Sequence, residues 1–481
     1  MAGKRGNISR MAMKAMGLFG GVQVIGILCS IIRTKLVALW IGPVGIGLFG
    51  LFNNALEMIT TGTNLGIRSS SVRDISQAMD GQNTSLVARI VTVVRKWSLW
   101  LGLGGALLTL ALAPLLSQVT FGDSTHIWGF VALSIAVLLQ ALTNGEYAVL
   151  QGTARLKRLA SVTLWGTIAG LAVSIPLFYL LRERSIVPSI LAYALALAVF
   201  AWWFRNRDYP PAAVTRRETV DMGKGFVKLG IYMTLGNFAT ILASYAFNAW
   251  LNINAGTEQV GFYQAGYTLI NKYTGLILTA LGMEYYPRLA KVAESRLRLR
   301  AFVSQEINVA IAVMAPVVAL FILLRSFIVQ LLYRPDFDVI LTFVSWGMIG
   351  TVLRTLSWCL AFTILAKGDG KTYLWTEVAS AVINLVLNIV FYRWWGLTGL
   401  GVAFLVSYLL YTLIIAVVYF RTYRLSVSAA SLYNLLWTLA VAAGVMAAME
   451  GGYTIIAAAI TVVSIAVGLR QIVVLWRRGV S

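Results

Sequence analysis

Charge, histidine and cysteine are all scarce in this chain. Only 12% of the 481 residues are charged, whereas a soluble domain has roughly a quarter. There is one histidine, His126, and there are two cysteines, Cys29 and Cys359, which stand far apart inside apolar segments. This inventory offers no material for a metal site, a CxxC redox pair or a histidine-based triad. We expect both thiols to be buried and structural.

Motifs for nucleotide use and hydrolysis are missing as well. The sequence contains no Walker A pattern, and it has no pair of carboxylates in a loop that resembles a general acid and base. The loops predicted on the outer side are all short, which leaves little room for an outer catalytic domain. The sequence therefore argues against an enzyme and predicts no cofactor.

Long apolar runs dominate instead. Hydrophobic residues make up 59% of the chain, and the mean hydropathy is +0.79. The runs are continuous over about twenty residues, the length of a membrane-spanning helix, whereas a barrel strand would alternate over about ten. We predict an all-α polytopic membrane protein with about 14 transmembrane helices. They are expected at residues 14–36, 44–66, 97–119, 127–149, 159–181, 186–204, 229–251, 261–284, 303–324, 338–364, 373–392, 398–420, 432–449 and 453–475.

The positive charge is distributed unevenly over the loops. The net charge is +21, and 30 of the 39 Lys and Arg residues fall in one set of loops and tails, against five in the opposite set. Loops on the cytoplasmic side of a membrane protein carry such an excess. We predict that both termini are cytoplasmic. The topology accounts for most of the net charge, so nucleic-acid binding is not needed to explain it.

The chain shows signs of an internal repeat. One alignment of the sequence with itself places Val44–Phe49 on Glu258–Tyr263, and an alignment shifted by one further position places Tyr147–Leu150 on Phe362–Leu365. Secondary transporters often contain such repeats. We predict two parallel halves of six spans each, followed by two extra helices.

This repeat suggests a division into four parts. They are an N-lobe at residues 1–204, a cytoplasmic linker at 205–228, a C-lobe at 229–424, and an appendage with the C-terminal tail at 425–481. The later part of the linker, 216–228, has the basic amphipathic pattern of a short helix lying on the inner leaflet, or of a solvated loop.

Ionisable and amide side chains inside the predicted spans are the candidate site residues. A charge at bilayer depth costs about 2.5–3.5 kcal/mol on insertion scales, so it usually faces a protein interior or a water-filled cavity. The intramembrane cations are Arg33, Lys35, Lys272 and Arg354. Cations suit an anionic ligand, and Arg in particular offers a planar fork to phosphate.

Neutral and acidic groups accompany these cations. Amides suit a sugar, and the candidates are Asn53, Asn54, Asn64, Asn248 and Asn271. The acidic candidates for ion coupling are Glu57 and Glu377. Each pair of cations has an alternative to a role in a cavity. Arg33 and Lys35 could extend to the outer interface by snorkelling. Lys272 and Arg354 could form buried ion pairs with glutamates.

Three stretches resemble the polysaccharide flippases of the Wzx type, which belong to the multidrug/oligosaccharidyl-lipid/polysaccharide (MOP) exporter superfamily and include the enterobacterial common antigen and O-antigen translocases. They are residues 35–50 (KLVALWIGPVGIGLFG), the run Tyr286-Pro287-Arg288-Leu289, and the region from Trp346 to Glu377. The resemblance implies two six-helix lobes in a V around a central cationic cavity, here with two extra C-terminal helices.

The resemblance also implies a function and a location. The substrate would be an undecaprenyl-diphosphate-linked saccharide, moved by alternating access from the cytoplasmic to the periplasmic leaflet of the bacterial inner membrane. The four cations would receive the diphosphate, and an Na⁺ or H⁺ gradient or the membrane potential would supply energy. Membrane lipids and other polysaccharide-assembly proteins are the expected partners.

Two other functions remain to be separated from this one. A multidrug exporter on the same fold would raise drug resistance in cells, although cationic drugs favour acidic cavities and the central candidates here are basic. A membrane glycosyltransferase or polymerase of surface polysaccharide would form new glycosidic bonds rather than move its substrate.

Overall fold

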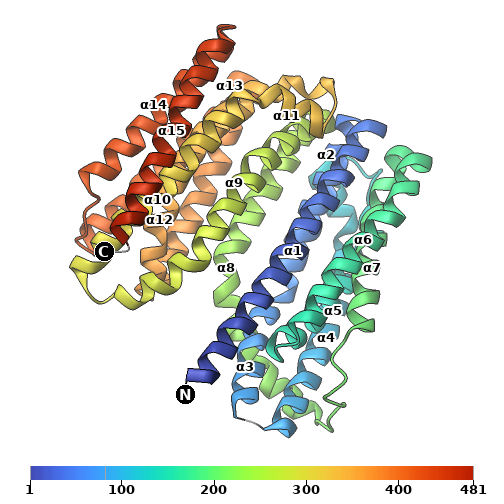
Figure 1. Cartoon of the computed structure of the whole chain (residues 1–481). Coiled ribbons are helices and arrows are strands. Elements are labelled where there is room, and N and C mark those ends of the chain that lie inside the picture. Colours follow the sequence, from blue (N-terminus) through green and yellow to red (C-terminus); the bar gives the residue numbers. More distant parts are fainter. Residues whose placement is uncertain (1, 82, 480–481) are drawn as a thin grey trace. The chain divides into compact units, whose positions relative to one another are not determined.

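A computed structural model of the chain describes residues 2–81 and 83–479 (Figure 1). Helices make up 90% of the chain, and no strand occurs among those residues. The helices assemble into two compact units, the first ending at Val260 and the second beginning at Gly261. Each unit is described separately below.

The first unit contains eight α-helices and a short 3₁₀ turn at Arg182–Ser185. The helices are α1 (Ala2–Trp40), α2 (Pro43–Asn64), α3 (Ile67–Asp80), α4 (Thr84–Phe121), α5 (Ile127–Gly152), α6 (Leu156–Leu181), α7 (Ile186–Trp203) and α8 (Arg216–Ala255).

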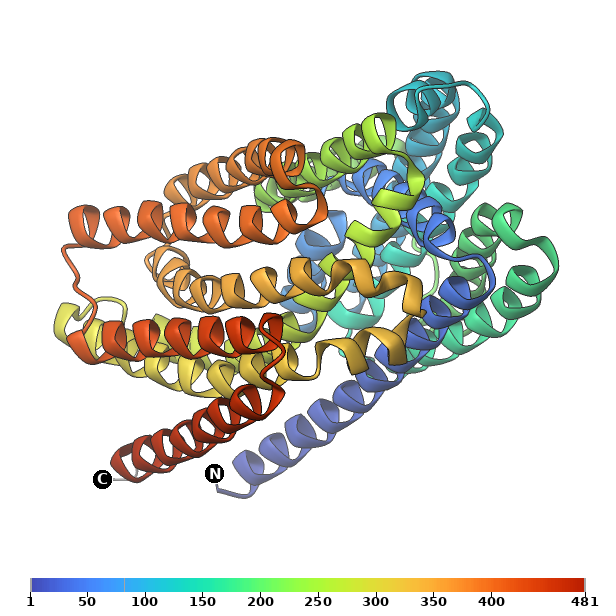
Figure 2. The same cartoon turned by 90° about the horizontal axis from the view of Figure 1, so that it is seen from above.

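The second unit takes in all but the first residues of α9 and the rest of the chain. Its helices are α9 (Thr257–Val292), α10 (Arg296–Leu323), α11 (Arg325–Leu332), α12 (Leu341–Ala366), α13 (Gly370–Val417), α14 (Ala429–Glu450) and α15 (Thr454–Gly479), with a 3₁₀ segment at Pro335–Ile340 and a π-helical turn at Val418–Thr422. The last two helices lie beside α10 (Figure 1, Figure 2). There Asn434 joins Asn308 to Gln471 through hydrogen bonds of 2.9 and 3.1 Å.

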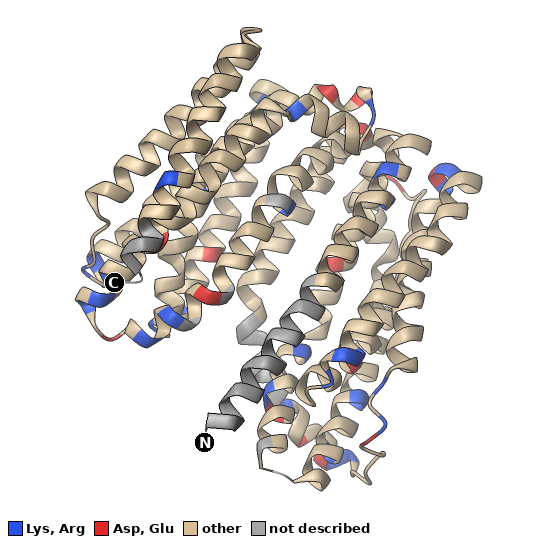
Figure 3. Cartoon of the chain, viewed as in Figure 1, with Lys and Arg blue, Asp and Glu red and all other residues tan. Residues whose placement is uncertain are grey.

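The predicted fold class is confirmed, since every expected span falls on a helix. Within the described part of the chain, nine helical stretches are long and apolar enough to cross a bilayer, and two of them each contain two expected spans. The count of fourteen is consistent with this. Large apolar side chains stay exposed along the helices, for example Leu107 at 65% and Val462 at 64%. Such exposure suits a surface that lipid covers, and Figure 3 shows most charges near helix ends.

The internal repeat is present in the secondary structure at the shift that carries Val44 onto Glu258, which we call the repeat shift. It carries the bounds of α5, 127–152, onto those of α12, 341–366. It also carries the start of α6 onto the start of α13, and the end of α7 onto the end of α13. The helix α13 is therefore two helices joined at a kink, where Trp395 and Gly396 leave helical geometry.

Unusual backbone angles recur at the repeat shift. Gly42 (φ 85°, ψ −161°) corresponds to Gly256 (φ 89°, ψ 164°), and Arg182 (φ 51°, ψ −126°) to Gly396 (φ 57°, ψ −137°). Angles of this kind are rarely adopted by residues other than glycine. Their coincidence indicates that the two turns keep the same geometry in both halves of the repeat.

The second sequence match was wrong by one residue. The turn after α5 has hydrogen bonds from Thr153 N to Val149 O and from Arg155 N to Leu150 O. The repeat shift carries these two bonds onto those of the turn after α12, from Lys367 to Thr363 and from Asp369 to Ile364. Apolar segments align almost equally well one residue apart, so the hydropathy pattern could not distinguish the two alignments.

The linker differs from the expectation in its later part. Residues 216–228 form the first turns of the continuous helix α8, rather than a separate helix on the inner leaflet or a loop. Thr215 caps this helix, because its hydroxyl accepts from Glu218 N while the Glu218 carboxylate accepts from Thr215 N. The division into two lobes and an appendage stays a prediction.

The earlier part of the linker, 205–215, lies against α3, α4 and α5. Arg95 of α4 binds Glu146 of α5 with two bonds of 2.7 and 3.0 Å, and it also donates to the carbonyl of Asn206. The fully buried Asn206 donates in turn to Thr153 Oγ1 at 3.0 Å. Lys96 donates to the carbonyl of Val214 at 3.1 Å. Two side chains of α4 and the Thr153 hydroxyl at the end of α5 thus hold this segment against the helices of the first unit.

Helix α3 was not expected from the sequence. Leu65 (φ 48°) and Gly66 (φ 65°) take left-handed conformations and end α2, so the chain starts a new helix of 14 residues. Its apolar side, including Ile67 and Ile75, is buried against Val91 and other residues of α4 and α5. The helix is too polar overall to cross a membrane, and its short amphipathic run was hidden between two stronger apolar signals.

Candidate functional site

Arg354 is the best-defined of the predicted cations, and it belongs to the second unit. It lies midway along α12 and is half-buried. Its Nη1 donates to Asn271 Oδ1 of α9 at 2.7 Å, and its guanidinium lies 5.8 Å from the ring centre of Tyr408 in α13. Asn271 Nδ2 donates to the carbonyl of Tyr267, one turn earlier, at 3.1 Å. This bond turns the amide oxygen toward Arg354, so the orientation of the guanidinium is set by three helices.

The partners of Arg354 are neutral, and its charge is therefore not cancelled. No ion pair found among the described residues includes Arg354. The predicted acid Glu377 instead accepts a hydrogen bond of 2.7 Å from the hydroxyl of Tyr411. The alternative of a buried Arg354–glutamate pair is thus not what this structure contains. A guanidinium with neutral ligands keeps donors that an anion can use.

Arg33 occupies an aromatic setting in the first unit. Its guanidinium carbon lies 4.8 Å from the ring centre of Phe49 in α2 and 5.0 Å from that of Tyr193 in α7. Both distances are within the range of a cation–π interaction. Its Nε is buried and has no hydrogen-bond partner among the described residues. Arg33 is therefore packed between rings inside the unit, rather than extended toward the outer interface.

The remaining predicted residues are placed individually. Asn53 and Asn248 turn back on their own helices, donating at 2.8 and 2.7 Å to the carbonyls of Phe49 and Ser244. The Nδ2 of Asn54 is buried without a partner among the described residues. Of the others, Lys35, Asn64 and Lys272 are half-buried and Glu57 is exposed. Among the predicted residues, Arg354 and Asn271 are the pair for which a direct bond is found in the described part of the chain.

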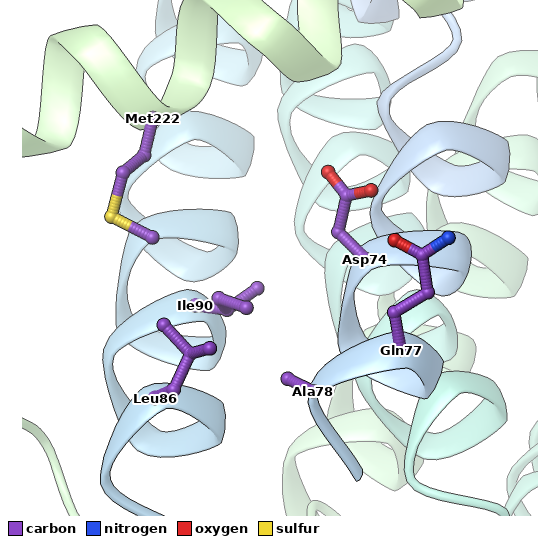
Figure 4. Close-up of a pocket in the computed structure, with 6 residues that line it drawn as sticks. All are labelled: Asp74, Gln77, Ala78, Leu86, Ile90 and Met222. Carbon is purple, nitrogen blue, oxygen red and sulfur yellow. The ribbon is translucent and has the colours of Figure 1, made fainter. Parts of the chain in front are cut away.

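A pocket lies elsewhere, among α3, α4 and α8 of the first unit. It has a volume of about 380 Å³ and is lined by Asp74, Gln77, Ala78, Leu86, Ile90 and Met222 (Figure 4). Partial burial raises the pKa of the Asp74 carboxyl, an effect that the neighbouring Arg73 opposes. None of the predicted site residues lines this pocket.

Comparison with known proteins assigns this sequence to a family. Residues 74–341, more than half of the chain, match the family described as polysaccharide biosynthesis protein. The chain belongs to this polysaccharide biosynthesis family. The match begins in α3 and ends at the start of α12, so it spans most of both halves of the repeat.

Individual relatives of this chain have a low sequence identity to it. The lipid III flippase of Escherichia coli (strain K12) is 23% identical over 389 residues, which cover 78% of this chain and 90% of the flippase. A lipid III flippase of Shigella flexneri matches to the same extent. These relatives are flippases, not enzymes. The resemblance to the polysaccharide flippases is confirmed at the level of the family.

Solved structures show the same fold. The lipid II flippase MurJ in an inward closed conformation matches with a TM-score of 0.73 over 98% of this chain and 100% of that one, at 12% identity. An inward-facing multidrug resistance MATE family transporter of the MOP superfamily matches with a TM-score of 0.67, over 86% of this chain and 95% of that one, at 15% identity. At such low identities these matches establish the fold. This chain is therefore a multi-pass membrane protein that shares its fold with MurJ and with this MATE transporter.

The aromatic members of the site were missed in the sequence. Phe49, Tyr193 and Tyr408 each hold a predicted cation, and Tyr411 holds the predicted acid. A signal existed in α13, because Tyr408 and Tyr411 are three residues apart and so lie on one face of the helix. Apolar spans contain so many aromatic residues that this spacing by itself does not distinguish a functional pair of tyrosines from tyrosines that only pack.

Proposed function

We propose that this protein is a flippase for a lipid-linked oligosaccharide. It moves an undecaprenyl-diphosphate-linked saccharide from the cytoplasmic to the periplasmic leaflet by alternating access. The observation that carries the proposal is Arg354, at the middle of a membrane-spanning helix, whose partners found within the described residues are all neutral. Family membership and the lipid III flippase relatives support it.

The charge of Arg354 is the physical basis of the proposal. Holding a cation at this depth is unfavourable unless something offsets the lost hydration. Asn271 and the face of Tyr408 offset part of this cost without neutralising the charge. The remaining N–H donors suit a diphosphate, which binds a guanidinium in a bidentate way.

Arg33 fits the same role in the first unit. The rings of Phe49 and Tyr193 fix the plane of its guanidinium and leave its edge to a ligand. Lys35 and Lys272 complete the proposed diphosphate-binding set. The amides Asn53, Asn54, Asn64, Asn248 and Asn271 are proposed for the glycan.

Energy coupling is assigned to Glu57 or Glu377. The hydroxyl of Tyr411 donates to Glu377 at 2.7 Å, so a proton or cation arriving at this carboxylate would change its contact with the second half of α13. An Na⁺ or H⁺ gradient, or the membrane potential, is the proposed energy source. Both termini are placed in the cytoplasm by the distribution of Lys and Arg.

The proposal is tested in a bacterial strain that lacks its lipid III flippase. Expression of the wild-type chain should reduce the accumulation of lipid-linked saccharide on the cytoplasmic side. Arg354→Gln should lower this activity at least tenfold at equal protein level, because it removes the charge. Arg354→Lys should retain part of it, because Lys restores the charge without the fork.

Asn271→Ala and a surface variant complete the design. Asn271→Ala should weaken transport less than Arg354→Gln, since the cation remains but loses its fixed orientation. Arg184→Gln removes an exposed arginine from the short turn between α6 and α7 and should change nothing. Full activity of Arg354→Gln would remove this residue from the mechanism. Increased drug resistance without any saccharide movement would favour the multidrug exporter.

A further inference from the structure

One end of the second unit carries a set of exposed cations. We call this set the basic face, and it comprises Lys291, Arg296, Arg298, Arg300, Lys367, Arg421 and Arg424. The residues come from the end of α9, the start of α10, the turn after α12 and the segment after α13. Figure 3 shows blue residues gathered where α9 passes into α10.

Direct contacts hold these segments together. The guanidinium of Arg296 donates to the carbonyl of Arg424, with an Nε–O distance of 2.9 Å. Lys367 Nζ donates to the carbonyl of Ala293 at 2.8 Å and lies 6.0 Å from the ring centre of Tyr423. The backbone of one segment is therefore bound by the cations of another, and the positive charges are brought close to one another.

Acidic partners are missing from the basic face. None of the ion pairs in the described part of the chain includes a residue of the face. Two acids lie nearby. Asp369 is occupied, because its carboxylate accepts from Thr372 and from the hydroxyl of Tyr423. Glu294 is exposed and forms no ion pair within the described range. The seven cations of the face thus form no ion pair with either acid among the described residues.

The first unit, related by the repeat, provides an internal comparison. There Arg155 and Arg158 both pair with Asp208 of the linker, and Arg89 pairs with Glu218 at 2.7 Å. The repeat shift carries Asp208 onto Thr422, so the segment after α13 lacks this acid, while Arg421 corresponds to Arg207 and Arg424 to Pro210. The cations of the segment after α13 thus lack the carboxylate that pairs with Arg155 and Arg158 in the first unit.

Helix stability does not explain the placement of these arginines. Arg296, Arg298 and Arg300 occupy the first turns of α10, which contain no acidic residue. Cations near the start of a helix are unfavourable, because the helix dipole places positive charge there. The repulsion among these groups would be relieved by an anionic partner.

We infer that the basic face binds anionic phospholipid headgroups of the bilayer that the protein spans. Each basic residue near an anionic membrane surface strengthens binding by about fivefold. Leu297 is 81% exposed between Arg296 and Arg298, so an apolar side chain stands beside the phosphate-binding groups. A lipid offers both an anionic headgroup and acyl carbons to this surface. The inference does not depend on the proposed flippase activity.

The test compares phosphatidylglycerol with phosphatidylcholine of identical acyl chains. The purified full chain in detergent is titrated with each lipid, and bound lipids are counted by native mass spectrometry. We expect phosphatidylglycerol to bind at least tenfold more tightly. The variant Arg298→Gln/Arg300→Gln/Arg421→Gln should weaken its binding by about a hundredfold, at about fivefold per residue. The variant with Lys at the same three positions should bind like the wild type, and it controls for folding.

A matched variant removes the same number of cations from the first unit. Arg89→Gln/Arg155→Gln/Arg158→Gln should change phosphatidylglycerol binding by less than about twofold, because these residues lie outside the basic face and contact the carboxylates of Asp208 and Glu218. Equal losses in the two Gln variants, or equal binding of the two lipids, would overturn the inference. Displacement of phosphatidylglycerol by inorganic phosphate at the same concentration would also overturn it, since the face would then be a site for free anions.

Discussion

The ion pair between Arg95 and Glu146 should be one of the strongest single contributions to the stability of the first unit. It joins α4 to α5 through two hydrogen bonds, and Arg95 also holds the linker by donating to the carbonyl of Asn206 at 3.0 Å. The two side chains are only 25% and 14% exposed. We therefore expect the replacement Glu146→Gln to leave a poorly solvated cation without its partner.

The magnitude follows from the burial. Breaking a fully buried pair costs about 3–5 kcal/mol, and the partial exposure of Arg95 reduces this to roughly 2–3 kcal/mol by admitting water. For a unit of this size each kcal/mol shifts the midpoint of thermal unfolding by about 2–4 °C, so Glu146→Gln should lower it by about 5–10 °C. Arg95→Gln should cost more, because it also releases the linker.

Thermal unfolding followed by tryptophan fluorescence in detergent measures these shifts. The double variant Arg95→Gln/Glu146→Gln should be less destabilised than the sum of the two single variants, since removing both charges leaves none unpaired. Arg155→Gln serves as the control, because its pair with Asp208 is half exposed and should contribute about 0–1 kcal/mol. The reasoning fails if Glu146→Gln shifts the midpoint no further than this control does.

Three further results are expected. Gly396→Ala should destabilise the second unit by about 1–3 kcal/mol, because a side chain is strained at φ 57° and ψ −137°, and an unchanged unfolding midpoint would contradict this. Gly145→Ala should lower the midpoint, since its Cβ would lie 2.3 Å from Ser98 Oγ, and the added change Ser98→Gly should restore much of the loss. Asp369 caps the start of α13, and hydrogen bonds from the side chain and backbone of Thr372 hold the pKa of its carboxyl below the usual value. The cap therefore stabilises α13 above about pH 4, and this stabilisation is lost as the pH falls through the lowered pKa. Asp369→Ala should cost about 0.5–2 kcal/mol at pH 7 and progressively less as the pH is lowered below about 4, which unfolding measured over this pH range can establish.

The membrane-spanning helices and the repeat could be predicted because their signals are local or periodic. An apolar run of about twenty residues is visible in the sequence whatever it packs against. The turns that repeat contain glycine at positions such as Gly42 and Gly256, where the backbone angles demand it. The start of α8 was also readable, since Thr215 and Glu218 form a capping box, but the basic residues that follow suggested an interfacial segment instead.

The contacts of the candidate site could not be predicted in the same way. Arg354 and Asn271 are 83 residues apart in sequence, and nothing local links a guanidinium to one particular amide among many. The pairing of Glu377 with Tyr411, rather than with an arginine, has the same cause. Both depend on which faces of α9, α12 and α13 meet, and apolar helices of similar hydropathy all round do not reveal their inward faces.

The order of residues alone determined that this chain crosses a membrane many times and contains two related halves. The hydration of apolar segments and the backbone angles that favour glycine are properties of short stretches. The tertiary structure alone decided which cations stay unneutralised. Arg95 and Arg155 meet carboxylates from other segments, whereas Arg354 meets an amide and a ring. The physical reason is that the effect of a charge depends on its neighbours in space, and these are brought together only by folding.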